Sequence, residues 1–157
     1  MIVSQYVPYV LQESHTLNVL QSRVHGLDHW FRVWKNAQLL IGKEPKASLE
    51  VIALYALFHD SMRLNDGIDP DHGFRGYKLW ERFHQKHDHK DFLSEHEKEL
   101  FFEACTEHNK GYQTTNPTIA VCWDADRLDL HRKGIWPDVR FMSTQDGIAL
   151  CMTRITR

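Results

Sequence analysis

The first strong pattern follows Gly26, where apolar side chains recur at spacings of one, three and four residues. Because an α-helix repeats about every 3.6 residues, this spacing places them on one stripe of a helix. The stripe consists of Leu27, Trp30, Phe31, Trp34, Ala37, Leu40 and Ile41. Gly42-Lys43-Glu44-Pro45 follows and disfavours continuation of a helix. We therefore predict a helix over residues 27–41.

Residues 47–62 (ASLEVIALYALFHDSM) are apolar on nearly every side. A helix at the surface keeps a polar face, whereas a helix that is apolar all round lies inside a domain. We predict that this segment is a central, buried helix. It carries His59 and Asp60 at its end.

Local capping signals mark two later helices. Ser94 and Glu97 form a capping box that predicts a helix running to about His108. Pro117 suits the first turn of a helix, because its missing N–H is not needed there, and this helix is expected to run through Leu130. Both segments lie between stretches of Gly, Pro, Asn and Asp that predict loops.

The remaining helices are expected over residues 14–23, over residues 74–88 and in a short last segment that begins near Ser143 or Asp146. No set of alternating apolar and polar residues predicts β-strands. The fold class is therefore predicted to be all-α, a helical bundle of about six to seven helices. We expect one domain over residues 1–157, with a core at about 20–132 and a C-terminal helical extension at 133–157.

The composition limits the possible functions. The chain has 157 residues, 42% of them hydrophobic, and a formal charge of −2, which suits one folded domain and gives no basic field for duplex nucleic acid. Its cysteines, Cys105, Cys122 and Cys151, form no CxxC pair, which argues against disulfides and against a cysteine zinc site. No signal-peptide pattern and no apolar run of about 20 residues occurs in the sequence, so we expect a cytoplasmic protein without membrane spans.

His59 and Asp60 are unusual because they close a very apolar segment. A buried carboxylate is expected to be paired or bound to a metal ion. One interpretation needs no metal: His59 caps the carbonyls of its helix and Asp60 pairs with Arg63. His29, within the stripe helix, is the next candidate, although a lone histidine beside apolar residues is often only a satisfied core residue.

The late helix strengthens the metal interpretation. At about 100° per residue, Asp126 falls in the middle of an apolar arc formed by Ile119, Cys122, Trp123 and Leu130. Asp124 points roughly the opposite way and Asp129 lies at the edge of the arc. Only one of the three carboxylates is therefore predicted to face the core, where an unpaired charge is very unfavourable.

Together these residues predict a metal site with ligands His29, His59, Asp60 and Asp126. Two imidazoles and two carboxylates suit a divalent ion such as Mn²⁺, Fe²⁺, Co²⁺, Ni²⁺ or Zn²⁺, with water at open positions, and the identity of the ion, Mg²⁺ included, stays open. His25, four residues before His29, is a candidate partner for a ligand.

The chain resembles the HD-domain superfamily of metal-dependent phosphohydrolases over roughly residues 20–132. The pattern H…HD…D is present as His29, His59-Asp60 and Asp126. Its flanks also fit: H-x-x-R-V begins at His29, A-L-F-H-D ends at Asp60, and D-A-D-R-L-D spans residues 124–129. In such families the ligand aspartate lies in A-D-R/K-L, which matches Asp126. The resemblance implies a hydrolase whose substrate is a nucleotide or another small phosphate ester.

A divalent ion would lower the pKa of a water molecule and polarise a phosphoryl oxygen. The reaction would also need an acid for the leaving oxygen and positive charge for the other oxygens. We predict catalytic roles for Asp60, His72 and His108, although His108 would also suit a helix C-cap. Predicted substrate-binding residues are Arg63, Arg75, Lys110 and Arg127, of which Arg63 and Arg127 could equally be structural partners of nearby carboxylates.

Several alternatives stay open at this point. A second metal ion is compatible with the histidines that lie between Asp60 and Asp126, which include His72, His84, His87 and His108. Arg63 stands where some nucleotidase families carry a catalytic Glu, which puts their acid–base scheme in doubt here. The same fold could serve an HD-type diiron oxygenase that uses His72 or His84 with His108, a non-catalytic nucleotide-binding domain, or a structural helical domain without metal. The monomeric or oligomeric state also stays open.

Overall fold

The computed structural model describes residues 2–87 and 92–155, and within them it is all-helical. The α-helices of the described chain are α1 (Val7–His15), α2 (Leu27–Ile41), α3 (Leu49–Phe58), α4 (His72–His87), α5 (Glu95–Glu107), α6 (Pro117–Arg127) and α7 (Gln145–Ile155). Short 3-10 turns are η1 (Ile2–Gln5), η2 (Val19–Gln21), η3 (His108–Lys110), η4 (Leu130–Lys133) and η5 (Val139–Phe141). The prediction of an all-α bundle of six to seven helices is confirmed.

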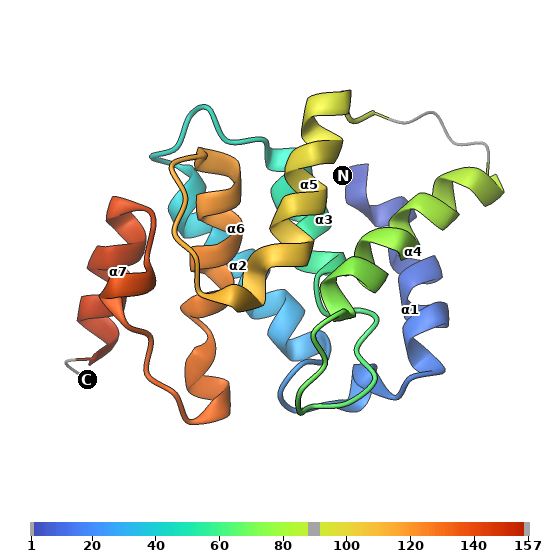
Figure 1. Ribbon diagram of the computed structural model, residues 1–157, viewed down its shortest axis with the longest axis horizontal. Helices are drawn as coiled ribbons and strands as arrows, with labels where there is room; N and C mark the ends of the chain where they lie inside the picture. Colours follow the sequence, from blue (N-terminus) through green and yellow to red (C-terminus); the bar gives the residue numbers. More distant parts are fainter. Residues whose placement is uncertain (1, 88–91, 156–157) are drawn as a thin grey trace.

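Helix α3 lies at the centre of the bundle, as its apolar sequence predicts. It packs against α1, α2, α4, α5 and α6, and residues 51–56 and Phe58 are buried along it. Ser48 caps its first turn by accepting a hydrogen bond from the backbone N–H of Val51. Figure 1 shows α1 and α4 on one side of this centre and α7 on the opposite side, beyond α6.

Several helix boundaries follow local chemistry closely. Helix α2 has the predicted bounds, and the capping box of Ser94 and Glu97 is present at the start of α5. Asn116 caps α6 by accepting hydrogen bonds from two backbone N–H groups, and Pro117 occupies the first turn. At the start of a helix the first backbone N–H groups have no partner within the helix. A capping side chain accepts hydrogen bonds from some of them, and proline has no N–H to leave unpaired.

The first predicted helix, 14–23, is wrong. The chain instead forms α1 over Val7–His15, with Pro8 in its first turn, and then the 3-10 turn η2. Tyr6 and Val10 are fully buried in the core, so packing of the N-terminal segment fixes this helix earlier than the local pattern suggested. Asn18 adopts a left-handed conformation (φ 58°) between the two elements, which ends the helical run.

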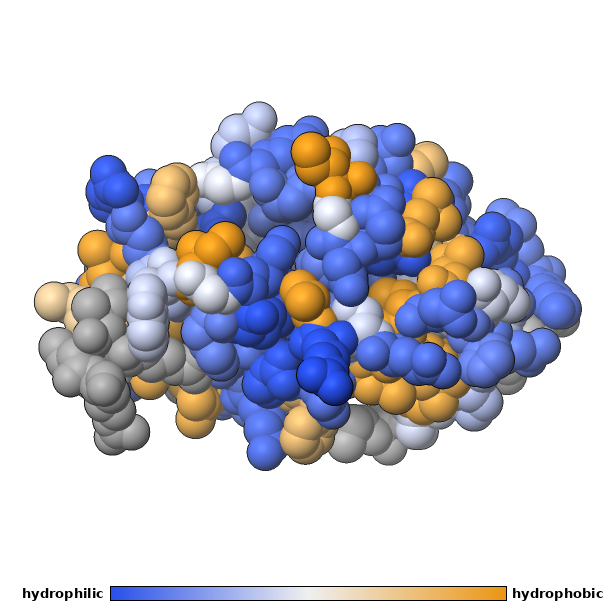
Figure 2. All heavy atoms as spheres, turned by 90° about the horizontal axis from the view of Figure 1, so that it is seen from below, coloured by the Kyte–Doolittle hydropathy of each residue, from blue (hydrophilic) through white to orange (hydrophobic). Residues whose placement is uncertain are grey.

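The connections from α3 to α4 and from α6 to α7 lie along the lower edge of Figure 1. Figure 2 views this edge from below, and hydrophilic side chains occupy most of the surface it shows. Within the described residues, every helix is too short or too polar to cross a lipid bilayer.

Helices α4 and α5 approach each other very closely at Gly73. A β-carbon at this position would overlap the carbonyl oxygen of Cys105 on α5, so only glycine allows this contact. The close approach determines the position of the first turn of α4 relative to the end of α5.

Candidate metal centre

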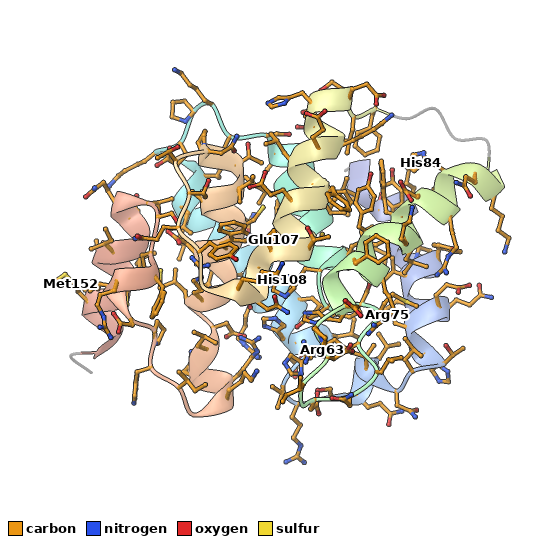
Figure 3. All side chains as sticks on the ribbon, in the orientation of Figure 1. Arg63, Arg75, His84, Glu107, His108 and Met152 are labelled. Atoms are coloured by element: carbon orange, nitrogen blue, oxygen red, sulfur yellow. The ribbon has the colours of Figure 1, made fainter. Side chains whose placement is uncertain are left out.

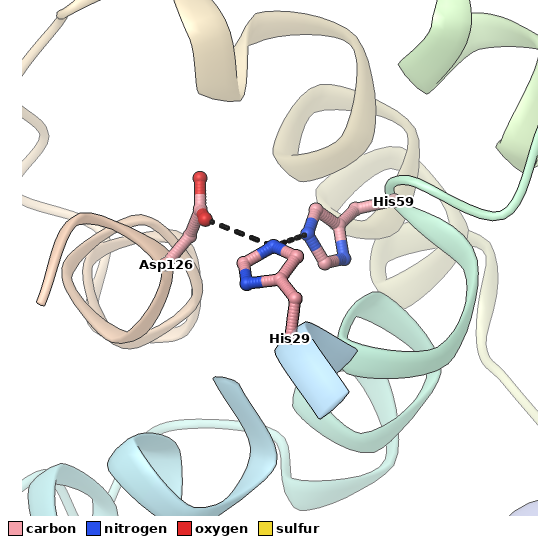
Figure 4. A group of neighbouring side chains, drawn as sticks. All are labelled: His29, His59 and Asp126. Carbon is pink, nitrogen blue, oxygen red and sulfur yellow. Dashed lines mark hydrogen bonds and ion pairs between the residues drawn. The ribbon is translucent and has the colours of Figure 1, made fainter. Parts of the chain in front are cut away.

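The first group of metal-capable side chains comes from three helices. His29 lies in the first turn of α2, His59 directly follows α3, and Asp126 lies near the end of α6. The Nε2 atom of His29 lies 3.1 Å from Nε2 of His59 and 3.3 Å from Oδ1 of Asp126, as Figure 4 shows. All three residues are buried, and their potential ligand atoms lie within 4.8 Å of one another, so they could hold a metal ion.

A second group consists of Asp60, His72 and His108, and it could hold a metal ion by the same criterion. His72 is the first residue of α4, and His108 directly follows α5. Their Nε2 atoms lie 2.8 Å apart, and both side chains are buried. The two histidines that were predicted as catalytic are therefore placed as potential metal ligands.

Asp60 joins the two groups, because each oxygen of its carboxylate faces one of them. Oδ2 lies 3.3 Å from Nε2 of His29 and 3.7 Å from Nε2 of His59. Oδ1 lies 3.1 Å from Nε2 of His72 and 3.8 Å from Nε2 of His108. The structure thus brings His29, His59, Asp60 and Asp126 together, with Asp60 as a bridge to a further pair of histidines.

In each of the four imidazoles (His29, His59, His72 and His108), the second ring nitrogen, Nδ1, contacts an oxygen atom that can only accept a hydrogen bond. The Nδ1 atoms of His59 and His108 lie 2.9 Å from the carbonyl oxygen of Tyr55 and 2.7 Å from that of Cys105, respectively. His29 contacts the Asp129 carboxylate at 2.8 Å, and His72 contacts the carbonyl oxygen of Asp69. Since a carbonyl or a carboxylate accepts hydrogen bonds, each Nδ1 carries a hydrogen. In a neutral imidazole, Nε2 then carries no hydrogen and has a free lone pair.

The Nε2 atoms of the four imidazoles consequently face one another and the two carboxylates, and that of His72 also accepts a hydrogen bond from Nη1 of Arg63 at 3.0 Å. Oδ1 of Asp126 is buried and accepts no hydrogen bond, although His29 lies 3.3 Å away. Electron pairs that converge in this way repel each other unless a cation lies between them. This chemistry fits a bound divalent ion, and nitrogen and oxygen donors with Nδ1 held by acceptors are the usual arrangement around such ions.

The pKa directions agree with neutral imidazoles at two positions. Burial lowers the pKa of His59 to about 3 and that of His108 to about 4. Burial also lowers the pKa of His29, but hydrogen bonds to Asp129 and Asp60 outweigh it and raise that pKa above its ordinary value. His29 therefore holds a proton more readily than its neighbours, and a metal ion would have to displace that proton.

The carboxylates stay ionised despite their burial. Burial alone would raise the pKa of Asp60, but the neighbouring imidazoles hold it well below its usual range. Burial likewise opposes ionisation of Asp126, and Arg132 together with His29 outweighs it, so that this pKa is also lowered. Negative charge is thus available between the two groups, from Asp60, and beside His29, from Asp126.

All three aspartates of α6 and its end are buried, which corrects the prediction that only Asp126 faces the core. Asp124 does point away from the metal groups, but its carboxylate accepts hydrogen bonds from Thr144 and from the backbone N–H of Ser143. The C-terminal segment therefore covers that side of the helix. Asp129 follows the end of α6 and turns toward His29, where Arg32 also contacts it at 2.7 Å.

A cavity of about 260 Å³ lies against Asp60, His72, His108 and Asp126. Basic side chains make up much of the rest of its lining, namely His25, Arg63, Arg127, Arg132 and Lys133. The far wall includes Asp138 and Phe141 from the C-terminal segment. A small anionic molecule placed in this cavity would meet both metal-capable groups and several positive charges.

Arg63 and Arg127 line the cavity, but both also hold backbone carbonyls. Arg63 donates to the carbonyl oxygens of Asn65 and Gly67 and lies 3.4 Å from Asp60 Oδ1. Arg127 donates to the carbonyl oxygens of Phe141 and Tyr112. The ion pair between Arg63 and Asp60 that a metal-free interpretation requires is thus present beside the histidines.

The structure does not bring the other two predicted substrate-binding residues to the cavity lining. Arg75 directs its guanidinium to the carbonyl oxygen of Met62 and to Asp69. Lys110 is exposed and pairs with Glu107 at 3.0 Å. Their predicted contacts with substrate therefore have no support from their positions.

Two further histidines lie elsewhere. His84 is hydrogen-bonded to the hydroxyl of Tyr6 at 2.8 Å, and twelve residues of α4 separate it from His72, about 18 Å along the helix. Figure 3 shows His108 and Arg63 near the middle of the molecule and His84 toward the outer end of α4. The interpretation in which His84 joins His108 as a metal ligand is therefore wrong. The side chain of His87 lies outside the described residues.

His25 was predicted to support a metal ligand, and the structure gives it a different partner. Its Nδ1 atom lies 2.8 Å from Asp66, which also accepts a hydrogen bond from Ser22. The ring meets that of His29 edge to face, with centroids 6.4 Å apart. His25 thus lies beside the first group and lines the cavity.

Asp129 and Arg132 are the functional candidates that the sequence patterns did not identify. Both follow the end of α6, where helical phase no longer predicts direction. The available signal was the spacing of three residues between Asp126, Asp129 and Arg132, which continues one side of the helix into the 3-10 turn.

No protein-family model, no curated protein and no solved structure matches this chain.

Proposed function

We propose that this chain is a metal-dependent phosphohydrolase of the HD-domain type that acts on a small phosphate ester, with nucleotides as the first class to test. The observation that carries the proposal is the convergence of four imidazole Nε2 atoms and two ionised carboxylates at one end of a cavity lined by several basic side chains. The order of His29, His59-Asp60 and Asp126 along the chain supports the HD assignment.

His29, His59, Asp60 and Asp126 would hold one divalent ion, and Asp60, His72 and His108 would hold a second. Such ions lower the pKa of water and polarise phosphoryl oxygens. The chain itself contributes position and charge. Asp129 and the backbone carbonyls keep the imidazoles in the Nδ1–H form, and the basic lining of the cavity attracts the anionic part of a substrate.

His25 is placed to exchange a proton with a molecule in the cavity. Asp66 holds its Nδ1 atom, and the ring borders the cavity. An imidazole oriented by a carboxylate is a common arrangement for general acid–base catalysis. Burial lowers the pKa of His25, so in the phosphohydrolase the neutral ring would accept a proton from the attacking water.

A panel of phosphomonoesters and phosphodiesters, nucleotides included, tests the proposal when run with Mn²⁺, Co²⁺, Ni²⁺, Mg²⁺ and Fe²⁺. We expect turnover with at least one ion. In Asp126→Asn the turnover rate should fall by at least about 1,000-fold, since the group of His29, His59 and Asp126 would no longer bind its ion normally. His96→Ala is the matched control, because this histidine is exposed on α5. Absence of turnover for every substrate and ion would contradict the proposal.

A second candidate function is oxygen chemistry at two irons. The observation that favours it is the bridging position of Asp60 between two histidine-containing groups, a donor set that also suits iron. Protein purified with about two irons per chain, together with oxygen uptake and no phosphate release, would favour this function over phosphate ester hydrolysis.

A further inference from the structure

Among the buried arginines that line the cavity, Arg132 is the one with a guanidinium donor that has no hydrogen-bond partner in the described part of the chain. It lies in the 3-10 turn η4, directly after α6, and its side chain is only 6% exposed. Its Nε donates to the carbonyl oxygen of Val24 at 2.7 Å, which fixes the plane of the guanidinium. Its Nη1 is buried and has no hydrogen-bond partner in the described structure.

The neighbouring carboxylates do not satisfy that donor. Nη2 of Arg132 lies 3.3 Å from Oδ1 of Asp126, and Nη1 lies 3.8 Å from Oδ2 of Asp129. The second distance is too long for a hydrogen bond. A buried N–H donor without an acceptor is unfavourable even beside carboxylates, because it has lost its hydrogen bond to water and gained no other hydrogen bond. Arg132 lines the cavity, so a partner can reach it from there.

The donors of the other cations that line the cavity are satisfied by backbone carbonyls or exposed to solvent. Arg63 and Arg127 each donate to two backbone carbonyls, and Lys133 is exposed to solvent. Arg132 therefore differs from them in offering an unused charge-assisted donor beside Asp126, a residue of the first metal-capable group. An anionic oxygen that approached this group would meet the guanidinium at the same time.

We propose that Arg132 binds a phosphoryl oxygen of the substrate and holds it against the first metal-capable group. The identity of the anion rests on the proposed function, whereas the need for an anionic partner rests on the geometry of Arg132 alone. A guanidinium suits this role because its fixed, planar donors match a phosphoryl group better than an ammonium group does.

The test uses the full chain saturated with Mn²⁺ and titrates inorganic phosphate by calorimetry. We expect Arg132→Met to weaken phosphate binding by about tenfold to a hundredfold, as for loss of a charge-assisted hydrogen bond. Arg132→Lys should lie between this variant and the wild type. Acetate is the comparison anion, and equal, Arg132-dependent binding of acetate would overturn the assignment to a phosphoryl group.

Arg32→Met is the matched control. Arg32 contacts Asp129 at 2.7 Å, so its loss also removes a cation from that carboxylate, but Arg32 does not line the cavity. We expect its phosphate affinity to stay within about twofold of the wild type. If Arg32→Met weakens phosphate binding as much as Arg132→Met does, Arg132 acts through Asp129 and the proposal is overturned.

A second measurement avoids dependence on a variant that fails to fold. In ¹⁵N spectra of the arginine side chains of the wild type, phosphate should shift the guanidinium signals of one buried arginine, which Arg132→Lys then assigns. Wild-type protein that binds no phosphate overturns this inference even if esters are hydrolysed. Conversely, Arg132-dependent phosphate binding without hydrolysis of any ester would contradict the proposed function and leave the anion site standing.

Discussion

The two metal-capable groups differ in how the fold holds them. His29 and Asp126 of the first group lie within helices α2 and α6, whose packing against each other positions both side chains. His72 and His108 of the second group lie at helix ends, after the polar loop 61–71 and after α5. The first group thus depends on helix packing, whereas the second depends on how α4 starts and α5 ends.

Asp60 belongs to both groups, so its substitution should affect them equally. Because its two oxygens face the two groups separately, Asp60→Ala should weaken metal binding by both groups. We expect each affinity to fall by more than about 100-fold, beyond the loss caused by removing a supporting residue. Calorimetry with Mn²⁺ and elemental analysis of the metal-loaded protein measure this.

Single-group variants provide the controls for that experiment. Asp126→Ala should impair the first group and spare the second, whereas His108→Ala should do the reverse. If Asp60→Ala removes binding by only one group, the bridging position does not describe how metal is bound.

Gly73→Ala should disturb the second group through the backbone. The new β-carbon would overlap the carbonyl oxygen of Cys105, which forces α4 away from α5 and so moves His72 relative to His108. We expect destabilisation of about 3 kcal/mol, in the upper range for overpacking, measured by urea unfolding of the metal-free protein. Metal binding by the first group should change much less.

The comparison variant is Gly42→Ala, because a β-carbon at Gly42 meets no heavy atom within 4 Å. Its free energy of unfolding should stay within about 1 kcal/mol of the wild type. Equal destabilisation by both alanines would show that the contact between Gly73 and Cys105 does not set the position of α4.

Asp129→Asn should affect the first group selectively. Asp129 accepts the Nδ1 hydrogen of His29, and an amide could instead present its NH₂ group and favour the other tautomer. Loss of such a supporting contact typically lowers metal affinity by about 10–100-fold. Calorimetry with Mn²⁺ tests this, with Asp66→Asn as the control, since Asp66 orients His25 rather than a proposed ligand. Unchanged affinity in Asp129→Asn would contradict the role given to this carboxylate.

The smallest effect is expected in the loop before His72. Burial would raise the pKa of Asp69, but hydrogen bonds from Arg75 and from the backbone N–H of Leu64 outweigh it and lower that pKa. A lowered folded-state pKa stabilises the protein above the unfolded pKa of about 3.9, and this stabilisation is lost as the pH falls through the folded-state pKa. Arg75→Gln should therefore destabilise the protein by about 1 kcal/mol or less at pH 7.

Urea unfolding at pH 7 and again below about pH 3 measures this dependence. The difference between wild type and Arg75→Gln should shrink as the pH falls, because Asp69 loses its charge as the pH passes through its folded-state pKa. A difference that is equal at both pH values would assign the effect of Arg75 to its contacts with Met62 instead.

The first group was predictable because its members lie on periodic helices or directly after one. The phase of α6 selected Asp126, and the apolar stretch ending at Phe58 drew attention to His59 and Asp60. The phase calculation could not include the C-terminal segment, whose packing buries Asp124. The start of α1 was missed for a similar reason, since burial of Tyr6 and Val10 is a property of the assembled core.

The convergence of the second group and the position of Arg132 could not be predicted from a periodic pattern. His72 and His108 were singled out from the sequence, but their convergence on Asp60 depends on the contact of α4 with α5 at Gly73. Arg132 lies in a 3-10 turn, where a count of 100° per residue no longer gives the direction of a side chain. Long-range packing, rather than local propensity, determines both features.

Helix α6 has no exposed side, since residues 118–127 are all buried. Asp126 on one side faces the metal-capable groups, and Asp124 on the other holds the C-terminal segment. A residue inserted or deleted before them in α6 would rotate both carboxylates by about 100° relative to the rest of the bundle, and one between them would rotate them relative to each other. We therefore expect that, among natural variants of this protein, α6 changes more slowly than the other helices and keeps its length.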